Sequence, residues 1–139
     1  MFLLDTNILS EPIRREPQPL VMQRWRQAAA DELRTSVVTL MELRYGAAKA
    51  AKPAALWGRI ETDLLSRCLV LPFSKEHALR AGEVQATLTR SNLAVDWRDV
   101  MIAAVALHHD FTLVTRNTRH FERIIGLKLE NWFEPPSVP

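Results

Sequence analysis

The chain has 139 residues and a formal net charge of +2, with 47% hydrophobic and 24% charged residues. This length predicts one domain with a buried core, and this composition is typical of a globular protein rather than a disordered or fibrous one. The single cysteine, Cys68, excludes an internal disulfide and a cysteine-based zinc site. We recognise neither a signal peptide nor an apolar run long enough to cross a membrane, which predicts a cytoplasmic protein.

Apolar patterns in the first half of the chain predict strands that alternate with helices. In chain order, they predict a strand at 2–5, a helix at 17–30, a strand at 33–38, a helix at 39–50 and a helix at 53–67. Either Ser36 or Thr39 is expected to cap the helix that follows the second strand. The first strand ends directly in a carboxylate, Asp5, which is an unusual place for an acid.

The alternation continues to the end of the chain. We expect a strand at 68–71, a helix at 75–90 capped by Ser74, a helix at 99–109, a strand at 111–117, a short helix at 120–125 and a last strand at 127–129. This order predicts an α/β fold with a mainly parallel sheet of about five strands, flanked by helices. Residues 1–133 would form the domain, and residues 134–139 an irregular tail.

Four polar side chains are predicted at the same edge of this sheet. Asp5 ends the first strand, Glu42 lies in the first turns of the helix after the second strand, Asp99 begins a helix, and Asn117 follows a late strand. Right-handed crossovers bring the carboxyl ends of parallel strands to one edge. Two carboxylates about 5 Å apart repel by roughly 3 kcal/mol at an effective dielectric of about 20. Such a cluster would therefore protonate in part or hold a hard cation such as Mg²⁺ or Mn²⁺.

Each of these residues also has an ordinary structural interpretation. Asp99 and Asp5 could cap the segments that follow them, Glu42 could be a solvated helix residue, and Asn117 could be a turn residue. Asp96 is expected in a loop, and the alternative is that it lines the cleft. None of these signals is specific alone, and only their convergence favours a metal site.

Four sequence blocks together resemble one protein family. The blocks FLLDTNILSE, TLMELRYG, DVMIAAVAL and FTLVTRNTRHF, in this order, resemble the PIN-domain ribonucleases. More narrowly, they resemble the VapC toxins of type II toxin–antitoxin systems, including the FitB branch, from Met1 to about Phe133. The resemblance implies a PIN-domain fold and metal-dependent endoribonuclease activity, with Mg²⁺ or Mn²⁺ as the cofactor.

The resemblance assigns the family's acidic positions to residues of this chain. The acid that ends the first strand falls on Asp5, the glutamate after the second strand on Glu42, and the aspartate that opens the Ile-Ala-Ala helix on Asp99. The fourth position, usually acidic, falls on Asn117, and a slot that is often aspartate falls on His120. We therefore expect one metal held by the protein, with a second arriving with the RNA.

The resemblance also implies a role for each acid. Asp5 and Asp99 would bind the metal directly or through water, and Glu42 would hold a metal-bound water or act as the general base. Single-stranded or loop RNA is the expected substrate, because unstacked strands can enter a cleft.

Other residues are expected to support this site. Thr6, Asn7 and Thr115 would position the ligands, although capping and turn formation explain Thr6 and Asn7 equally well. Arg116 or Arg44 could contact a phosphate.

The partners of the chain follow only from the resemblance. It implies a homodimer and a small cognate antitoxin, similar to VapB or FitA, which wraps the toxin and blocks the acidic cleft with a basic side chain. DNA would be contacted only indirectly, through the antitoxin.

Three other enzyme or regulator classes fit the sequence poorly. A haloacid-dehalogenase phosphatase needs a second aspartate where Asn7 stands, a response-regulator receiver needs an early acidic pair, and a Rossmann oxidoreductase needs a Gly-x-Gly-x-x-Gly turn. One alternative remains open. The chain could be a catalytically weak PIN-like partner that acts in a DNA-bound regulatory complex with its antitoxin, a hypothesis that the neutral Asn117 favours.

Overall fold

The computed structural model describes residues 1–136 as an α/β domain. In the first half the elements are β1 (Phe2–Leu4), α1 (Thr6–Leu9), η1 (Glu11–Ile13), α2 (Pro19–Gln27), η2 (Ala30–Glu32), β2 (Leu33–Ser36) and α3 (Val37–Ala48). There follow α4 (Pro53–Arg59), the π-helix η3 (Ile60–Leu65), β3 (Leu69–Leu71), α5 (Lys75–Arg90), α6 (Trp97–His109), β4 (Thr112–Val114), α7 (Thr118–Phe121) and β5 (Lys128–Glu130).

The five strands form one sheet in the order β3-β2-β1-β4-β5, and every neighbouring pair is parallel. Phe2 of the central strand β1 pairs with Leu33 on one side and with Thr112 on the other. Because all the strands run the same way, all of their carboxyl ends lie at one edge. The predicted α/β fold with a mainly parallel sheet is confirmed.

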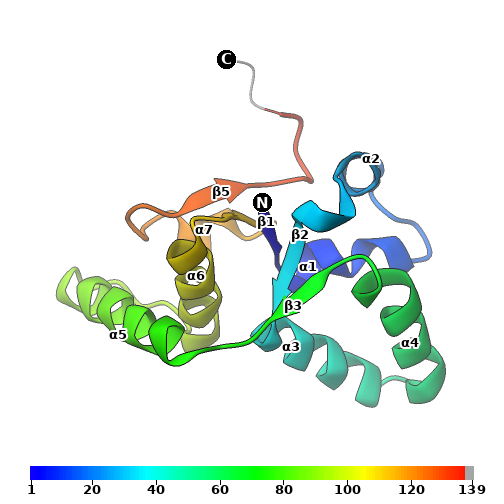
Figure 1. Cartoon of the computed structure of the whole chain (residues 1–139), viewed down its shortest axis with the longest axis horizontal. Coiled ribbons are helices and arrows are strands. Elements are labelled where there is room, and N and C mark those ends of the chain that lie inside the picture. The colour runs from blue at the N-terminus through cyan, green and yellow to red at the C-terminus, as the bar shows by residue number, and fades with distance from the viewer. Residues whose placement is uncertain (137–139) are drawn as a thin grey trace.

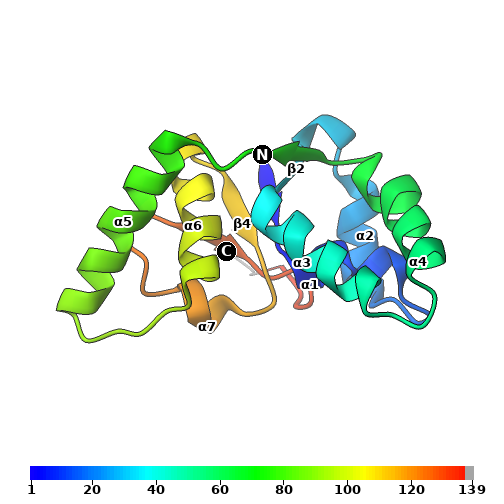
Figure 2. The ribbon, with the colours of Figure 1, turned by 90° about the horizontal axis from the view of Figure 1, so that it is seen from below.

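Helices cover both faces of the sheet. Leu3 and Leu4 are both fully buried, and they belong to different core clusters because successive side chains of a strand point to opposite faces. The cluster around Leu3 includes buried residues of α5 and α6, whereas the cluster around Leu4 includes buried residues of α1 and α2 (Figure 1; Figure 2 shows the same two layers from below). In the described part of the chain, no helix is both long and apolar enough to cross a membrane.

The second strand is shorter than the sequence predicted. It ends at Ser36, and α3 begins at Val37 rather than at Thr39. Ser36 is the cap, because its hydroxyl oxygen accepts a hydrogen bond from the Thr39 backbone N–H at 3.2 Å. The β-branched pair Val37 and Val38 favoured a strand locally, but the capping contact places both in the helix.

The helix α6 begins earlier than predicted, and this changes the interpretation of two acids. Asp96, expected in a loop, is its N-cap and accepts a hydrogen bond from the Arg98 backbone N–H at 2.8 Å. Asp99 therefore lies inside the first turn and does not begin the helix. The Asp99 carboxylate is consequently free for other contacts.

Several other predicted boundaries were wrong. The short helix α1, directly after β1, was not predicted. The expected helix at 17–30 is reduced to Pro19–Gln27, the strand at 111–117 to Thr112–Val114, and the helix at 120–125 is replaced by Thr118–Phe121. Residues 134–136 are in neither helix nor strand, as predicted for the tail, and residues 137–139 lie outside the described residues.

Two histidines, His77 in the first turn of α5 and His109 at the end of α6, form a close pair. The Nε2 atoms of His77 and His109 are 2.9 Å apart, and the Nδ1 atom of His77 accepts the Ser74 backbone N–H at 2.9 Å. Only one proton can lie between the two Nε2 atoms. Burial lowers the pKa of both histidines below the usual 6.5, and the neighbouring histidine charges add to this effect.

This pair predicts a loss of stability at mildly acidic pH. The unfolded chain takes up protons on His77 and His109 at a higher pH than the folded chain does, so the free energy of unfolding should fall as the pH drops from 6.5 through the lowered pKa values. Urea unfolding of the wild type and of His109→Gln across this range tests it. The variant should show the shallower loss, and parallel curves would contradict the prediction.

Candidate active site

Asp5 is fixed in place at the carboxyl end of the central strand. Its side chain is 6% exposed. Oδ1 accepts the Thr6 backbone N–H at 2.8 Å, and Oδ2 accepts the hydroxyl of Thr115 at 2.8 Å. The Asp5 backbone N–H also donates to Val114 at 3.0 Å, which joins β1 to β4. Asp5 therefore caps α1, as one interpretation of the sequence allowed, and is at the same time held at the sheet edge.

Glu42 reaches the same edge from the helix α3. It is half-buried, and its Oε1 atom accepts a hydrogen bond from the hydroxyl of Thr6 at 3.1 Å. Because Thr6 follows Asp5 directly, its backbone N–H contacts one carboxylate and its hydroxyl contacts the other. Thr6 thus links the two acids.

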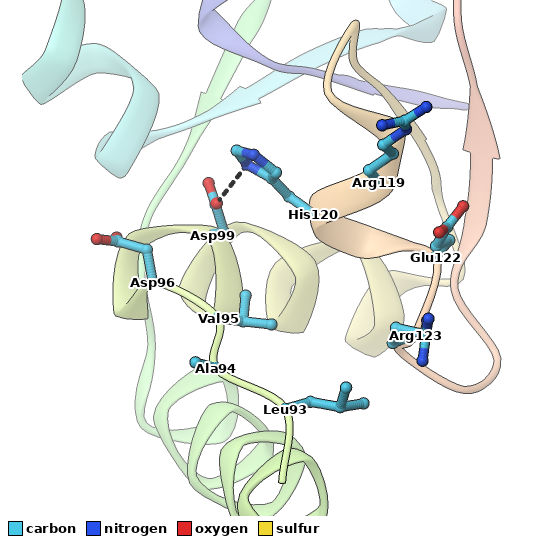
Figure 3. Close-up of a pocket in the computed structure, with 9 residues that line it drawn as sticks. All are labelled: Leu93, Ala94, Val95, Asp96, Asp99, Arg119, His120, Glu122 and Arg123. Atoms are coloured by element: carbon cyan, nitrogen blue, oxygen red, sulfur yellow. Dashed lines mark hydrogen bonds and ion pairs between the residues drawn. The ribbon is translucent and has the colours of Figure 1, made fainter. Parts of the chain in front are cut away.

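Asp99 faces the site from the first turn of α6. Its side chain is 23% exposed, and its Oδ2 atom lies 3.2 Å from Nδ1 of His120 on α7, as Figure 3 shows. This contact brings α7 against α6 at the mouth of the site.

These acids line one cavity of about 480 Å³. Its acidic lining consists of Asp5, Glu42, Asp96 and Asp99, and the other lining residues are Thr6, Asn7, Arg98, Asn117 and His120. The structure therefore brings together the three predicted carboxylates and the predicted residues Thr6, Asn7 and Asn117. Segments far apart in the sequence converge here because β1, β2 and β4 are parallel neighbours.

Thr115 and Asn117 lie just behind the cavity and at its edge. The Thr115 hydroxyl is fully buried, donates to Asp5, and accepts the Asn117 backbone N–H at 3.1 Å. Asn7 accepts the Arg116 backbone N–H on its side-chain oxygen at 3.2 Å. The loop after β4 is thereby tied to the helix α1 that follows β1.

The two arginines suggested as phosphate contacts do not line this cavity. The guanidinium of Arg44 lies over the ring of Trp57 at 4.7 Å, and that of Arg116 lies over Phe133 at 4.5 Å. Arg98, which sequence reasoning missed, lines the cavity instead, and its Nε atom is 3.1 Å from Asp96. The sequence signal that could have identified Arg98 was its position between Asp96 and Asp99 at the start of one helix.

Comparison with known proteins identifies the family. A model of the PIN domain matches residues 2–127. Ribonuclease VapC2 of Haemophilus influenzae is 37% identical over 131 residues, which cover 94% of this chain and 97% of the relative. The chain belongs to the VapC family of PIN-domain proteins. A second relative, the tRNA(fMet)-specific endonuclease VapC of Shigella flexneri, is 39% identical over the same shares of the two chains.

Solved structures agree with this assignment to the VapC family. The FitAcB structure from Neisseria gonorrhoeae matches with a TM-score of 0.90 and 28% identity, over 97% of this chain and all of that chain. DNA-bound VapBC from Salmonella typhimurium matches with a TM-score of 0.86 and 35% identity, over 94% and 97% of the two chains. The resemblance inferred from the four sequence blocks is confirmed.

The carboxylates of this VapC-family site are held in an environment that disfavours their charge. Burial raises the pKa of Asp5, and the Asp99 charge adds to the rise, against the hydrogen bonds from Thr115 and Thr6. Burial also raises the pKa of Glu42, helped by the charges of Asp5 and Asp99, and burial raises the pKa of Asp99. A cation in the cavity would relieve this penalty.

The donor set fits a hard divalent cation that keeps part of its water shell. Within residues 1–136, no three His, Cys, Asp or Glu side chains are already arranged to hold a metal together. Mg²⁺ commonly binds proteins through only one or two carboxylates and retains several waters. Carboxylates such as Asp5 and Asp99, on separate elements but in one cavity, suit that mode of binding better than a closed protein cage.

Proposed function

We propose that this chain is the toxin of a type II toxin–antitoxin pair and an endoribonuclease that cleaves RNA phosphodiester bonds with Mg²⁺ or Mn²⁺. The observation that carries the proposal is the convergence of Asp5, Glu42 and Asp99 in one cavity of a VapC-family chain. The relatives named ribonuclease and tRNA(fMet)-specific endonuclease support RNA as the substrate.

The three carboxylates would have different roles. Asp5 and Asp99 would hold the cation, directly or through water. When bound, the cation would supply a more acidic water and offset negative charge on the scissile phosphate. Glu42 would hold that water or accept its proton. The raised pKa of Glu42 makes it a better proton acceptor than an ordinary surface glutamate.

The neighbouring residues would act through these acids. Thr6 would orient Asp5 and Glu42 through the two hydrogen bonds described above, and Asn7 would fix the loop after β4. Asn117 lines the cavity, and its side-chain amide would be a neutral oxygen ligand at a position where an acid is usual in the family. We therefore propose one protein-held cation, with a second arriving with the RNA.

We also propose a cognate antitoxin of the VapB or FitA kind as the partner of this chain. The support comes from structural neighbours that are toxin–antitoxin complexes, some of them bound to DNA: VapBC from Salmonella typhimurium and FitAB on a DNA fragment. Contact with DNA would then run through the antitoxin. The homodimer implied by the sequence resemblance remains a prediction.

An RNA cleavage assay tests the proposed activity. The purified chain is incubated with total RNA in the absence of antitoxin, and the new 5′ ends are then mapped. Cleavage should require Mg²⁺ or Mn²⁺, stop with a chelator, and be lost in Asp5→Asn. Asp31→Asn, which removes an exposed aspartate elsewhere, is the matched control and should cleave like the wild type. Absence of metal-dependent cleavage by the wild type would favour the alternative of a catalytically weak partner in a DNA-bound complex.

Thr115→Val should weaken both the site and the fold. It removes the only side-chain donor to Asp5 Oδ2 in the described structure and leaves that buried carboxylate oxygen unpaired. We expect about a 10- to 100-fold loss of metal affinity or activity and a loss of roughly 1–3 kcal/mol in the free energy of unfolding. Metal titration and urea unfolding measure the two effects. The exposed Thr62→Val is the control, and equal behaviour of the two variants would contradict the role of Thr115.

A further inference from the structure

A second cavity opens directly beside the acidic one. Its volume is about 330 Å³, at the lower end of the range of about 300–1,000 Å³ that is typical of small-ligand sites. Asp96, Asp99 and His120 line both cavities, so the two adjoin each other. Any strand whose phosphate lies at the carboxylates has this second cavity as its immediate neighbour.

One wall of the second cavity is apolar and firmly positioned. It is formed by Leu93 and Val95 in the connection between α5 and α6, and Figure 3 shows both side chains directed across the cavity. The Leu93 backbone N–H donates to Leu88 at 2.9 Å, and the Val95 carbonyl accepts the side-chain amide of Gln85 at 3.0 Å. This apolar wall therefore exists before any ligand binds.

The opposite wall carries two arginines and one glutamate. Arg119 on α7 and Arg123 just after it line the cavity, Arg123 across from Leu93 and Arg119 at the rim, and Glu122 lies between them in sequence (Figure 3). Both arginines are exposed, and within residues 1–136 neither forms an ion pair with a carboxylate. The cavity thus has an apolar wall at Leu93 and Val95 and a wall of mixed charge in which the two arginines outnumber Glu122. A single nucleotide likewise has a base whose face can pack on apolar side chains and a phosphate that can pair with arginine.

We infer that the second cavity binds one unpaired nucleotide of the substrate, next to the phosphodiester bond that is cleaved. This inference rests on the proposed function. The base lies against Leu93 and Val95, and the flanking phosphates contact Arg123 and Arg119. A paired base could not turn its face to this wall, so the site selects single-stranded or looped RNA at the position beside the cut.

A binding assay tests the role of the two arginines. The probe is a short, fluorescein-labelled, single-stranded oligoribonucleotide of mixed sequence, and binding is measured in chelator so that no cleavage occurs. The double variant Arg119→Ala/Arg123→Ala should bind about a hundredfold more weakly, since each charged contact contributes about tenfold. The slope of log K against log salt should be shallower by about 1.4 for this double variant than for the wild type, because two phosphate contacts are lost. Arg15→Ala/Arg26→Ala removes the same charge from exposed positions elsewhere and should keep the wild-type salt slope.

Two further strands test the rest of the site. Leu93→Ser should weaken binding of the base-containing strand and leave binding of an abasic strand of equal length unchanged. A blunt RNA duplex should bind the wild type more weakly than the single strand does. Any one of four results would overturn the inference. The two double variants could show equal salt slopes, or Leu93→Ser could lose equal affinity for the base-containing and the abasic strand. The wild type could bind the duplex as tightly as the single strand, or it could bind no RNA.

Failure of the proposed function gives a different result from failure of the second site. If the wild type binds RNA with these slopes but does not cleave it, the result supports the nucleotide site and refutes the proposed activity. If the wild type cleaves RNA and Arg119→Ala/Arg123→Ala has the same KM and kcat, the result supports the proposed activity and refutes the nucleotide site.

Discussion

Asp99→Asn is expected to reduce RNA cleavage at least about a hundredfold while making the metal-free protein more stable at neutral pH. The activity should fall because a proposed ligand of the cation loses its charge. The stability should rise because burial penalises the charged carboxylate, as the raised pKa of Asp99 indicates, and asparagine avoids that penalty. RNA cleavage assays and urea unfolding in chelator measure the two effects.

The pH dependence of this stability difference has a definite sign. When the pH falls through the raised pKa of Asp99, the wild-type carboxyl takes up a proton and its penalty disappears, whereas the neutral amide of the variant has no such penalty at any pH. The advantage of the variant should therefore be greatest at neutral pH and shrink on acidification. An inactive variant that is also less stable at neutral pH would instead point to damaged folding, and would contradict this account of the site.

Phe121→Ala should cause the largest loss of stability among these variants, about 3–5 kcal/mol in the free energy of unfolding. Phe121 is fully buried in the core cluster on the α6 side of the sheet, and it anchors α7 beside His120. Its removal leaves a large cavity under the segment that carries part of the acidic site. Urea unfolding with the linear extrapolation measures the loss.

Ile125→Ala is the matched control for this prediction. Ile125 lies four residues further along the chain but is 85% exposed, so its truncation should change the free energy of unfolding by no more than about 0.5 kcal/mol. Similar losses in the two variants would show that the segment after β4 is not held by Phe121.

The sequence was sufficient to predict the alternating α/β fold and the gathering of the acids, because both depend on short-range patterns. A short apolar strand that ends in Asp5, and a strand followed by a capped helix that carries Glu42, can be recognised without tertiary information. Parallel topology then brings these strand ends to one edge, whatever the lengths of the helices between them. Hence Asp5, Glu42 and Asp99 share one cavity as predicted.

Features that depend on competing contacts could not be predicted in this way. The start of α6 depends on whether Asp96 or Asp99 accepts a backbone N–H, and both acids have the right chemistry for a cap. The directions of Arg44 and Arg116 depend on the aromatic rings of Trp57 and Phe133. The short helix α1 has too few residues to show a period.

The pairing of β1 with β4 makes assembly of the acidic cavity depend on segments that are synthesised far apart in time. Asp5 leaves the ribosome well before the hydroxyl that holds its carboxylate, which belongs to Thr115, 110 residues further along. Asp99 and the second neighbour of the central strand also belong to the last third of the chain. A nascent polypeptide interrupted before these segments emerge therefore has no assembled acidic cavity.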